Sequence, residues 1–139
     1  MQDRPTPDEL LRAVQDFLRD DVQPALEGRT RFHLLVALNL LDVLRRELEL
    51  EPACRAREGE RLAALGLLEP TAEGPPAAAA APDPAALRAA NERLAGAIRA
   101  GRYDEGEARR ALLAHLRAVV TDKLRVANPA FLERVANEP

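Results

Sequence analysis

The most apolar stretch of the chain is residues 31–50, RFHLLVALNLLDVLRRELEL. On an α-helix the charged side chains of Asp42, Arg45, Arg46 and Glu49 share one face, but Leu35 and Leu38 lie on that same side one and two turns earlier. Its first half is therefore apolar nearly all round, and its second half is amphipathic. The stretch is too short and too charged to span a membrane. It predicts a central bundle helix that starts buried and ends at the surface.

The composition favours a helical fold. Hydrophobic residues make up 47% of the 139 residues, but aromatic residues only 3%, so Leu, Val and Ala must pack the core. Ala, Leu, Arg and Glu are strong helix formers, and the residues that favour strands are scarce. A chain of this length suits one domain. We therefore predict an all-α fold, a single-domain bundle of about five helices.

Local signals set the helix boundaries. Thr6, Pro7 and Glu9 have the spacing of a helix start with a capping box. Pro52 disfavours helical geometry at the residue before it, so one helix should end near Leu50 and another should follow. The predicted helices cover residues 7–23, 31–50, 53–65, 84–100 and 107–127, and a short tail helix from Pro129 to Val135 is also expected.

Residues 69–82, EPTAEGPPAAAAAP, predict a flexible Pro/Ala-rich loop between the third and fourth helices. The prolines prevent a continuous helix, and the stretch has no large apolar side chain to bury. A helical turn over Ala77 to Ala81 is the alternative. A loop of this kind would let the second half of the chain pack on the first half of its own chain or of a neighbouring one, as in a swapped dimer.

Composition and motifs exclude several classes of function. The net charge of −3 and the few aromatic residues do not suit a nucleic-acid partner. The single Cys54 excludes an internal disulfide framework and a cysteine-based zinc site. No phosphate-binding loop, dinucleotide fingerprint, nucleophile elbow or HExxH motif is present. We expect no cofactor, no metal and no catalytic residues. The first residues lack a basic and apolar leader, which predicts a cytoplasmic protein of bacterial type.

The two histidines are weak candidates for a binding site. His33 falls on the apolar side of the helix over 31–50, and His115 on the border of the apolar face of the helix over 107–127. They could meet and, with a carboxylate, hold a metal. No His-x-x-x-His or Glu-x-x-His spacing supports such a site, so packed or half-exposed histidines are the favoured interpretation.

Asn39 and Arg46 complete the set of weak candidates. Asn39 interrupts the most apolar helix, where a buried amide would hydrogen-bond across the bundle and fix the helix register. Ligand binding is the alternative role. Arg46, together with Arg29, Arg31 and Arg45, could bind a phosphate or a carboxylate. Asp42 and Glu49 lie within one turn of Arg46, so surface ion pairing is the simpler interpretation.

Two runs resemble an uncharacterised family of small all-helical bacterial proteins with no assigned function: RPTPDELLRAVQDFLRDDVQPALEGRTRFHLLVALNLLDVLRRELEL and LLAHLRAVVTDKLRVANPAF. The marks of the resemblance are the Ala-Leu-Glu-Gly-Arg turn, Phe32-His33, Asn39, Arg46-Glu47-Leu48 and the ending from Lys123 to Pro129. Members of this family are often encoded beside aminoglycoside-phosphotransferase-like kinases and acyl-CoA dehydrogenases. The resemblance implies an accessory role in acyl-CoA or related catabolism, and it supplies no catalytic residues.

Three classes of function remain. The leading hypothesis is a non-catalytic accessory protein. It would form a homodimer or bind a kinase-like or acyl-CoA dehydrogenase protein, because the apolar side chains of Leu35 and Leu38 lie on the otherwise polar side of their helix and a second chain could bury them. The alternative is a small-molecule binder of the acyl-CoA type, with an apolar pocket between the helices over 31–50 and 107–127 and contacts from Asn39, His33 or Arg46. An enzyme ranks third, since nothing places a nucleophile beside a base.

Overall fold

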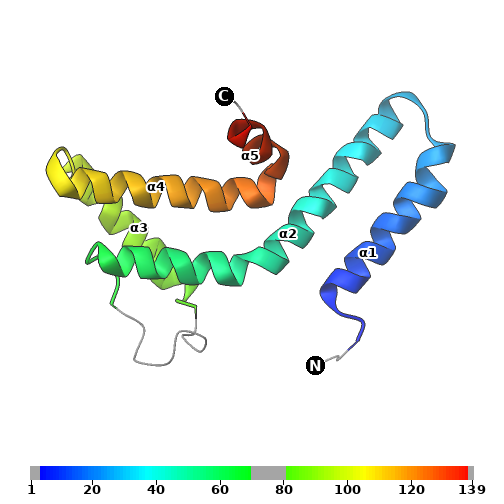
Figure 1. Cartoon of the computed structure of the whole chain (residues 1–139). Coiled ribbons are helices and arrows are strands. Elements are labelled where there is room, and N and C mark those ends of the chain that lie inside the picture. Colours follow the sequence, from blue (N-terminus) through cyan, green and yellow to red (C-terminus); the bar gives the residue numbers. More distant parts are fainter. Residues whose placement is uncertain (1–3, 70–80, 138–139) are drawn as a thin grey trace. The chain divides into compact units, whose positions relative to one another are not determined.

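The computed structural model describes residues 4–69 and 81–137, and these form five α-helices and no strand (Figure 1). The all-α prediction is confirmed. The helices are α1 (Pro7–Phe17), α2 (Gly28–Ala64), α3 (Pro84–Arg99), α4 (Gly106–Ala127) and α5 (Pro129–Ala136). No helix in the described part of the chain has the length and hydrophobicity needed to cross a membrane.

Helix α1 begins as its sequence predicts. The Thr6 Oγ1 accepts a hydrogen bond of 3.2 Å from the backbone N–H of Glu9, and the Thr6 N–H donates to Glu9 Oε2 at 2.7 Å. Regular α-helix stops at Phe17, earlier than the predicted residue 23, because the chain continues as a π-helical turn and then a 3₁₀ turn. Gly28, with a positive φ of 55°, then starts α2.

The predicted break near Pro52 is wrong, because α2 continues through this proline. The predicted helices over 31–50 and 53–65 are therefore parts of one helix. Pro52 cannot donate to the carbonyl of Leu48, and its ring crowds that carbonyl. Packing on both sides outweighs this local penalty, since Leu38 before the proline and Leu62 after it are both buried. The tail helix α5 brings the number of α-helices to five.

The chain forms two compact units, unit 1 (Met1–Leu50) and unit 2 (Glu51–Pro139). Unit 1 contains α1 and the first part of α2, and unit 2 contains the last part of α2 with α3, α4 and α5. That these units make a single domain stays a prediction. The predicted flexible loop over 69–82 lies outside the described residues, except for Glu69, Ala81 and Pro82.

The core of unit 2 lies among three helices. Its buried residues are Leu62 from α2, Leu87, Ala90 and Leu94 from α3, and Leu112 from α4, with Leu67, Leu68 and Tyr103 packed against them. The apolar face expected on the helix over 107–127 is only partly buried, because Leu113, Leu116 and Val120 of α4 remain exposed.

Two contacts hold the end of α2 and the start of α3 in place, one on each side of residues 70–80. On one side, the Arg93 guanidinium donates two hydrogen bonds to the carbonyl of Leu67, of 3.2 Å from Nε and 2.6 Å from Nη2. On the other side, the buried Pro82 packs so closely on Gly59 of α2 that a Cβ at Gly59 would collide with the proline ring. Gly59, which weakens the helix signal in the sequence, is thus required by this close approach.

Candidate functional site

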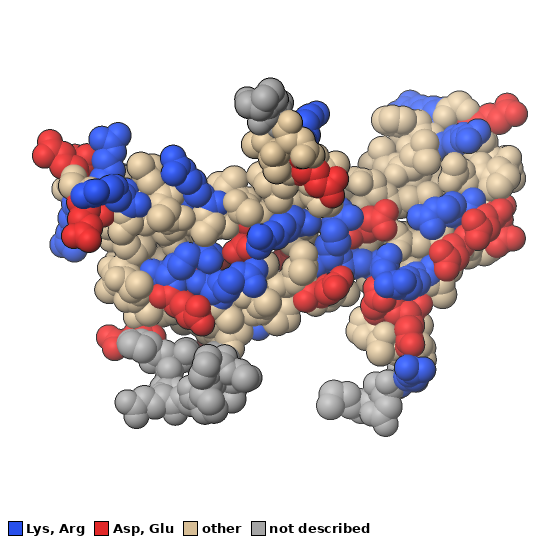
Figure 2. All heavy atoms as spheres, in the orientation of Figure 1, with Lys and Arg blue, Asp and Glu red and all other residues tan. Residues whose placement is uncertain are grey.

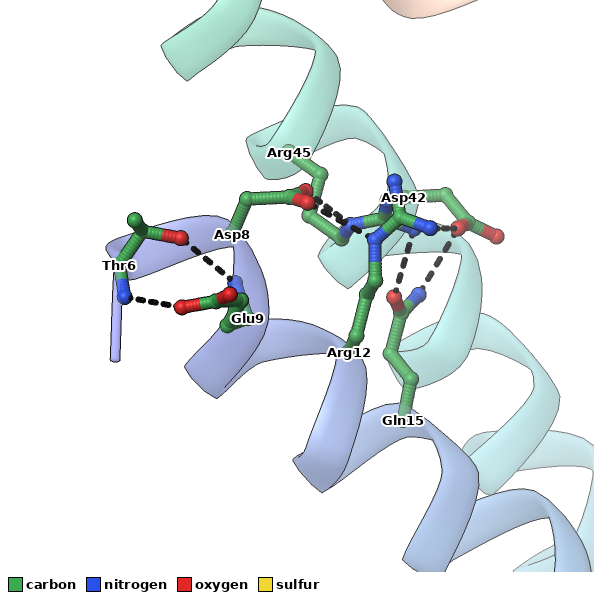
Figure 3. Close-up of polar contacts among 7 residues, drawn as sticks. All are labelled: Thr6, Asp8, Glu9, Arg12, Gln15, Asp42 and Arg45. Carbon is green, nitrogen blue, oxygen red and sulfur yellow. Dashed lines mark hydrogen bonds and ion pairs between the residues drawn. The ribbon is translucent and has the colours of Figure 1, made fainter. Parts of the chain in front are cut away.

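A polar network holds α1 against the first part of α2 (Figure 3). At its centre is Gln15, whose side chain is only 2% exposed. The Gln15 Nε2 donates to Asp42 Oδ1 at 2.8 Å and to the carbonyl of Leu38 at 3.4 Å. The Gln15 Oε1 accepts from Arg45 Nη1 at 3.2 Å. Both ends of this buried amide are therefore hydrogen-bonded, which fixes the register of the two helices.

The network continues toward the first turn of α1 through Asp8. This carboxylate accepts hydrogen bonds of 2.8 Å from the Nε of Arg45 and from the Nε of Arg12. The bond from Arg45, followed by that from Arg12, lowers the pKa of Asp8 below its usual value. Asp8 is therefore ionised at neutral pH, and positive and negative groups alternate along the network.

A cleft of about 440 Å³ opens beside this network. Its lining residues are Thr6, Pro7, Asp8, Arg12, Arg45, Leu48 and Glu49. The two arginines face two carboxylates, and both donate to Asp8, so the cleft has no excess of positive charge for an anion. The lining contributes polar groups from Thr6, Asp8 and Glu49 beside the apolar side chain of Leu48.

A second charged cluster lies in unit 2, around Asp122 of α4. Its carboxylate is within 3.0 Å of the Nη2 of Arg57, 3.2 Å of the Nη2 of Arg61 and 3.0 Å of the Nη1 of Arg125. In Figure 2 basic side chains gather where the last part of α2 lies beside α4. Burial by itself would raise the pKa of Asp122, but the hydrogen bonds and charges of Arg57 and Arg61 outweigh it and lower the pKa. The cluster joins α2 to α4.

His115, a predicted candidate, is buried in unit 2 with a side chain only 3% exposed. Its Nδ1 has no hydrogen-bond partner among the described residues. Burial, with the charge of Arg61, lowers the pKa of His115, against a smaller opposing effect of Glu58. The imidazole is therefore neutral at pH 7 and closed to solvent, as for the packed histidine that the sequence favours.

The other predicted candidates lie on α2 in unit 1. His33 is exposed, and its Nε2 accepts a hydrogen bond of 3.5 Å from Arg29 Nε. Asn39 is also exposed, so its predicted role as a buried amide is wrong. Arg46 is half-buried. Leu38, expected to need a second chain, is already buried inside unit 1, whereas Leu35 is exposed. The structure brings none of these residues into a shared site within unit 1.

Gln15 and Asp122, at the centres of the two polar clusters, were not candidates in the sequence, whereas Arg45 was a candidate for anion binding. The position of Gln15 in the sequence indicates burial, because it lies between Leu11 and Leu18 on the side of α1 that packs against α2. Asp122 lies two turns after His115 and so shares its face of α4. Among the residues that the structure describes, no group of three or more His, Cys, Asp or Glu side chains is arranged to hold a metal ion.

An exposed apolar stripe runs along α4. It consists of Leu113, Leu116 and Val120, which are between 39% and 54% exposed. We call these three residues the α4 stripe. The exposed side chains of Arg109, Arg117 and Lys123 lie within one turn of stripe residues along the helix. The α4 stripe is thus an uncovered apolar surface flanked by positive charge.

Comparison with known proteins places the chain in a family. Residues 24–131 match a family described as a domain of unknown function, DUF6285. The match covers more than half of the chain, and the chain therefore belongs to this family. No curated protein and no solved structure matches it significantly.

Proposed function

We propose that this member of the DUF6285 family is a non-catalytic accessory subunit that binds a kinase-like or acyl-CoA dehydrogenase protein in the cytoplasm. The observation that carries the proposal is the α4 stripe. Three large apolar side chains on one helix face, left uncovered by their own unit, are typical of a surface that another protein covers. The resemblance to proteins encoded beside such kinases and dehydrogenases supports the choice of partner.

The charges around the α4 stripe define the partner surface. Arg109, Arg117 and Lys123 flank it, and α4 carries no acidic residue on this side. A complementary surface would bury the leucines and valine in an apolar groove and place carboxylates at its rim. Such rim charges would raise the association rate and make binding weaken as salt increases.

The test is a pull-down of the tagged full-length chain from its native cells, with mass spectrometry. We expect the wild type to recover a kinase-like or dehydrogenase protein in near-equal amount. The double variant Leu116→Glu with Val120→Glu should lose it. The control Ala114→Glu places one such charge on another exposed face of α4 and should keep the partner. Recovery of neither protein class by the wild type would overturn the proposal.

A second candidate function is the binding of a small acyl-CoA-like molecule without catalysis. The observation in its favour is the cleft beside Asp8 and Arg45, whose volume of about 440 Å³ is within the range of ligand pockets. The two arginines of this cleft already pair with Asp8, so a phosphate-bearing ligand would have to compete with that carboxylate, and this function ranks second. A thermal-shift screen with acyl-CoAs and nucleotides tests it. An increase in melting temperature that Arg45→Ala abolishes would support this function, and no shift with any of these ligands would exclude it.

A further inference from the structure

Unit 1 leaves a second apolar surface uncovered. It consists of Leu10, Val14 and Phe17 on α1 and Leu40, Leu44 and Leu48 on α2, which are between 45% and 60% exposed. We call these six residues the hairpin face. Among the described residues of unit 1, Leu38 is the only buried hydrophobic residue, with 6% of its surface exposed. Two helices with one buried leucine lack a core of their own, so the apolar side of this unit needs another layer to cover it.

The six residues lie on one side of the helix pair. On α1, Gln15 and Asp8 lie to one side of the packed Leu11, and the three exposed residues of α1 lie to the other. On α2, Leu40 and Leu44 likewise lie on the opposite side of the packed Leu41 from Asp42, and Leu48 lies at the edge of the face, where it also lines the cleft. Because the polar residues of both helices meet in one network, the apolar residues of both helices share the opposite side.

The register of the helix pair makes this face continuous. The bond from Arg45 to Asp8 and that from Gln15 to Asp42 show that α1 and α2 run antiparallel. Leu10 is therefore level with Leu44, and Val14 is nearly level with Leu40. Six side chains of this size, each about half exposed, form an apolar patch of roughly 500 Å². With its flanking residues, such a patch approaches the roughly 800 Å² per partner of a standard interface.

We infer that the hairpin face binds the hairpin face of a second copy of this chain, so that two α1–α2 pairs form a four-helix bundle. A layer of two antiparallel helices with one apolar side is complementary to itself under two-fold symmetry. The inference rests on the proposed interaction function and adds the protein itself as a partner, at a surface other than the α4 stripe.

Charges at the turn between α1 and α2 suit a two-fold axis parallel to the helices. This axis places α1 of each copy over α2 of the other, with both turns at the same end. The exposed Asp21 at the end of the first helical segment would then approach Arg29 at the start of α2 in the other copy. The two opposite charges flank the same end of the hairpin face, so the contact is electrostatically favourable.

Sedimentation velocity of the full-length chain over a range of concentrations tests the inference. We expect the wild type to be a dimer and Leu40→Glu to be a monomer. The matched control Asn39→Glu adds the same charge at the neighbouring exposed position, off the hairpin face, and should remain a dimer. A wild type that is monomeric throughout, or a Leu40→Glu variant that is folded and still dimeric, would overturn it.

A milder variant keeps the test valid if Leu40→Glu does not fold. Leu40→Ala with Leu44→Ala removes apolar contact area without adding charge, and it should raise the dimer dissociation constant about tenfold or more while the helical circular dichroism is kept. An unchanged dissociation constant would contradict the inference. The proposed function fails separately, because only variants of the α4 stripe should lose the kinase-like or dehydrogenase protein.

Discussion

Gln15 of α1 and Asp42 of α2 are joined by a hydrogen bond of 2.8 Å between the Nε2 and the Oδ1 atom, and the glutamine is almost completely buried. Gln15→Ala should therefore destabilise the protein by about 1–3 kcal/mol, because it leaves a cavity and removes a partner from both Asp42 and Arg45. Urea denaturation measures this loss. Asn39→Ala, at an exposed amide, should change the stability by less than about 0.5 kcal/mol. Equal effects of the two variants would show that the network does not stabilise the helix pair.

The Asp122 cluster predicts an effect of similar size in unit 2. Asp122→Asn removes the charge that three guanidiniums share, and it should lower the free energy of unfolding by about 2 kcal/mol, since the arginines are partly exposed. Asp16→Asn is the control, because Asp16 makes only an exposed contact of 3.6 Å with Arg19. Urea denaturation of both variants would compare them. No loss of stability in Asp122→Asn would mean that the cluster does not hold α2 against α4.

The lowered pKa of His115 predicts a pH dependence of stability. Burial favours the neutral form of His115 in the folded protein. Once the pH falls below the ordinary histidine pKa of 6.5, this side chain therefore binds a proton more readily in the unfolded chain than in the folded chain. The stability is therefore complete above this pH and decreases below it. Urea denaturation at about pH 7.5 and about pH 5.5 should show the loss in the wild type and a smaller one in His115→Gln. The exposed His33 supplies the control, and His33→Gln should lose as much stability as the wild type.

Asp122 acts in a different pH window. Its pKa is lowered in the folded protein, so its contribution to stability is present above the ordinary value of 3.8 and is lost as the pH falls below it. The His115 experiment lies above this window. A loss between about pH 7.5 and about pH 5.5 that persists unchanged in His115→Gln would assign it to groups other than His115.

Two helical glycines should respond oppositely to alanine. At Gly59 a Cβ would collide with the ring of Pro82, so Gly59→Ala should lower the melting temperature despite the better helix propensity of alanine. At Gly96 a Cβ meets no atom within 4 Å, so Gly96→Ala should stabilise α3 by up to about 1 kcal/mol. Thermal denaturation of both variants checks this pair. Stabilisation by Gly59→Ala would contradict the close packing of Pro82 on α2.

The features that sequence predicts well here are those that depend on neighbouring residues. The start of α1 follows from Thr6 and Glu9, which are three residues apart, and the start of α3 follows from Asp83, whose side chain accepts from the N–H of Ala85. The continuity of α2 through Pro52 could not be predicted in this way. The penalty of a proline is local, whereas the packing of Leu38 and Leu62 that outweighs it involves residues far along the chain.

The polar clusters also could not be predicted from neighbouring residues alone. A helix that is apolar nearly all round does not indicate which side faces its neighbour, so Asn39 could be placed inside although it is exposed. The inward side is set by α1, through Gln15, Asp42 and Arg45. The burial of His115 agrees with its position at the border of the apolar face of the helix over 107–127, although Leu113, Leu116 and Val120 of that face are exposed.

The contacts of Leu67 with Arg93 and of Gly59 with Pro82 have an evolutionary consequence. They fix the end of α2 and the approach to α3 independently of the residues between them. Insertions or deletions within residues 70–80 therefore need not change these two contacts. Related chains can thus differ widely in length here while keeping the same core in unit 2.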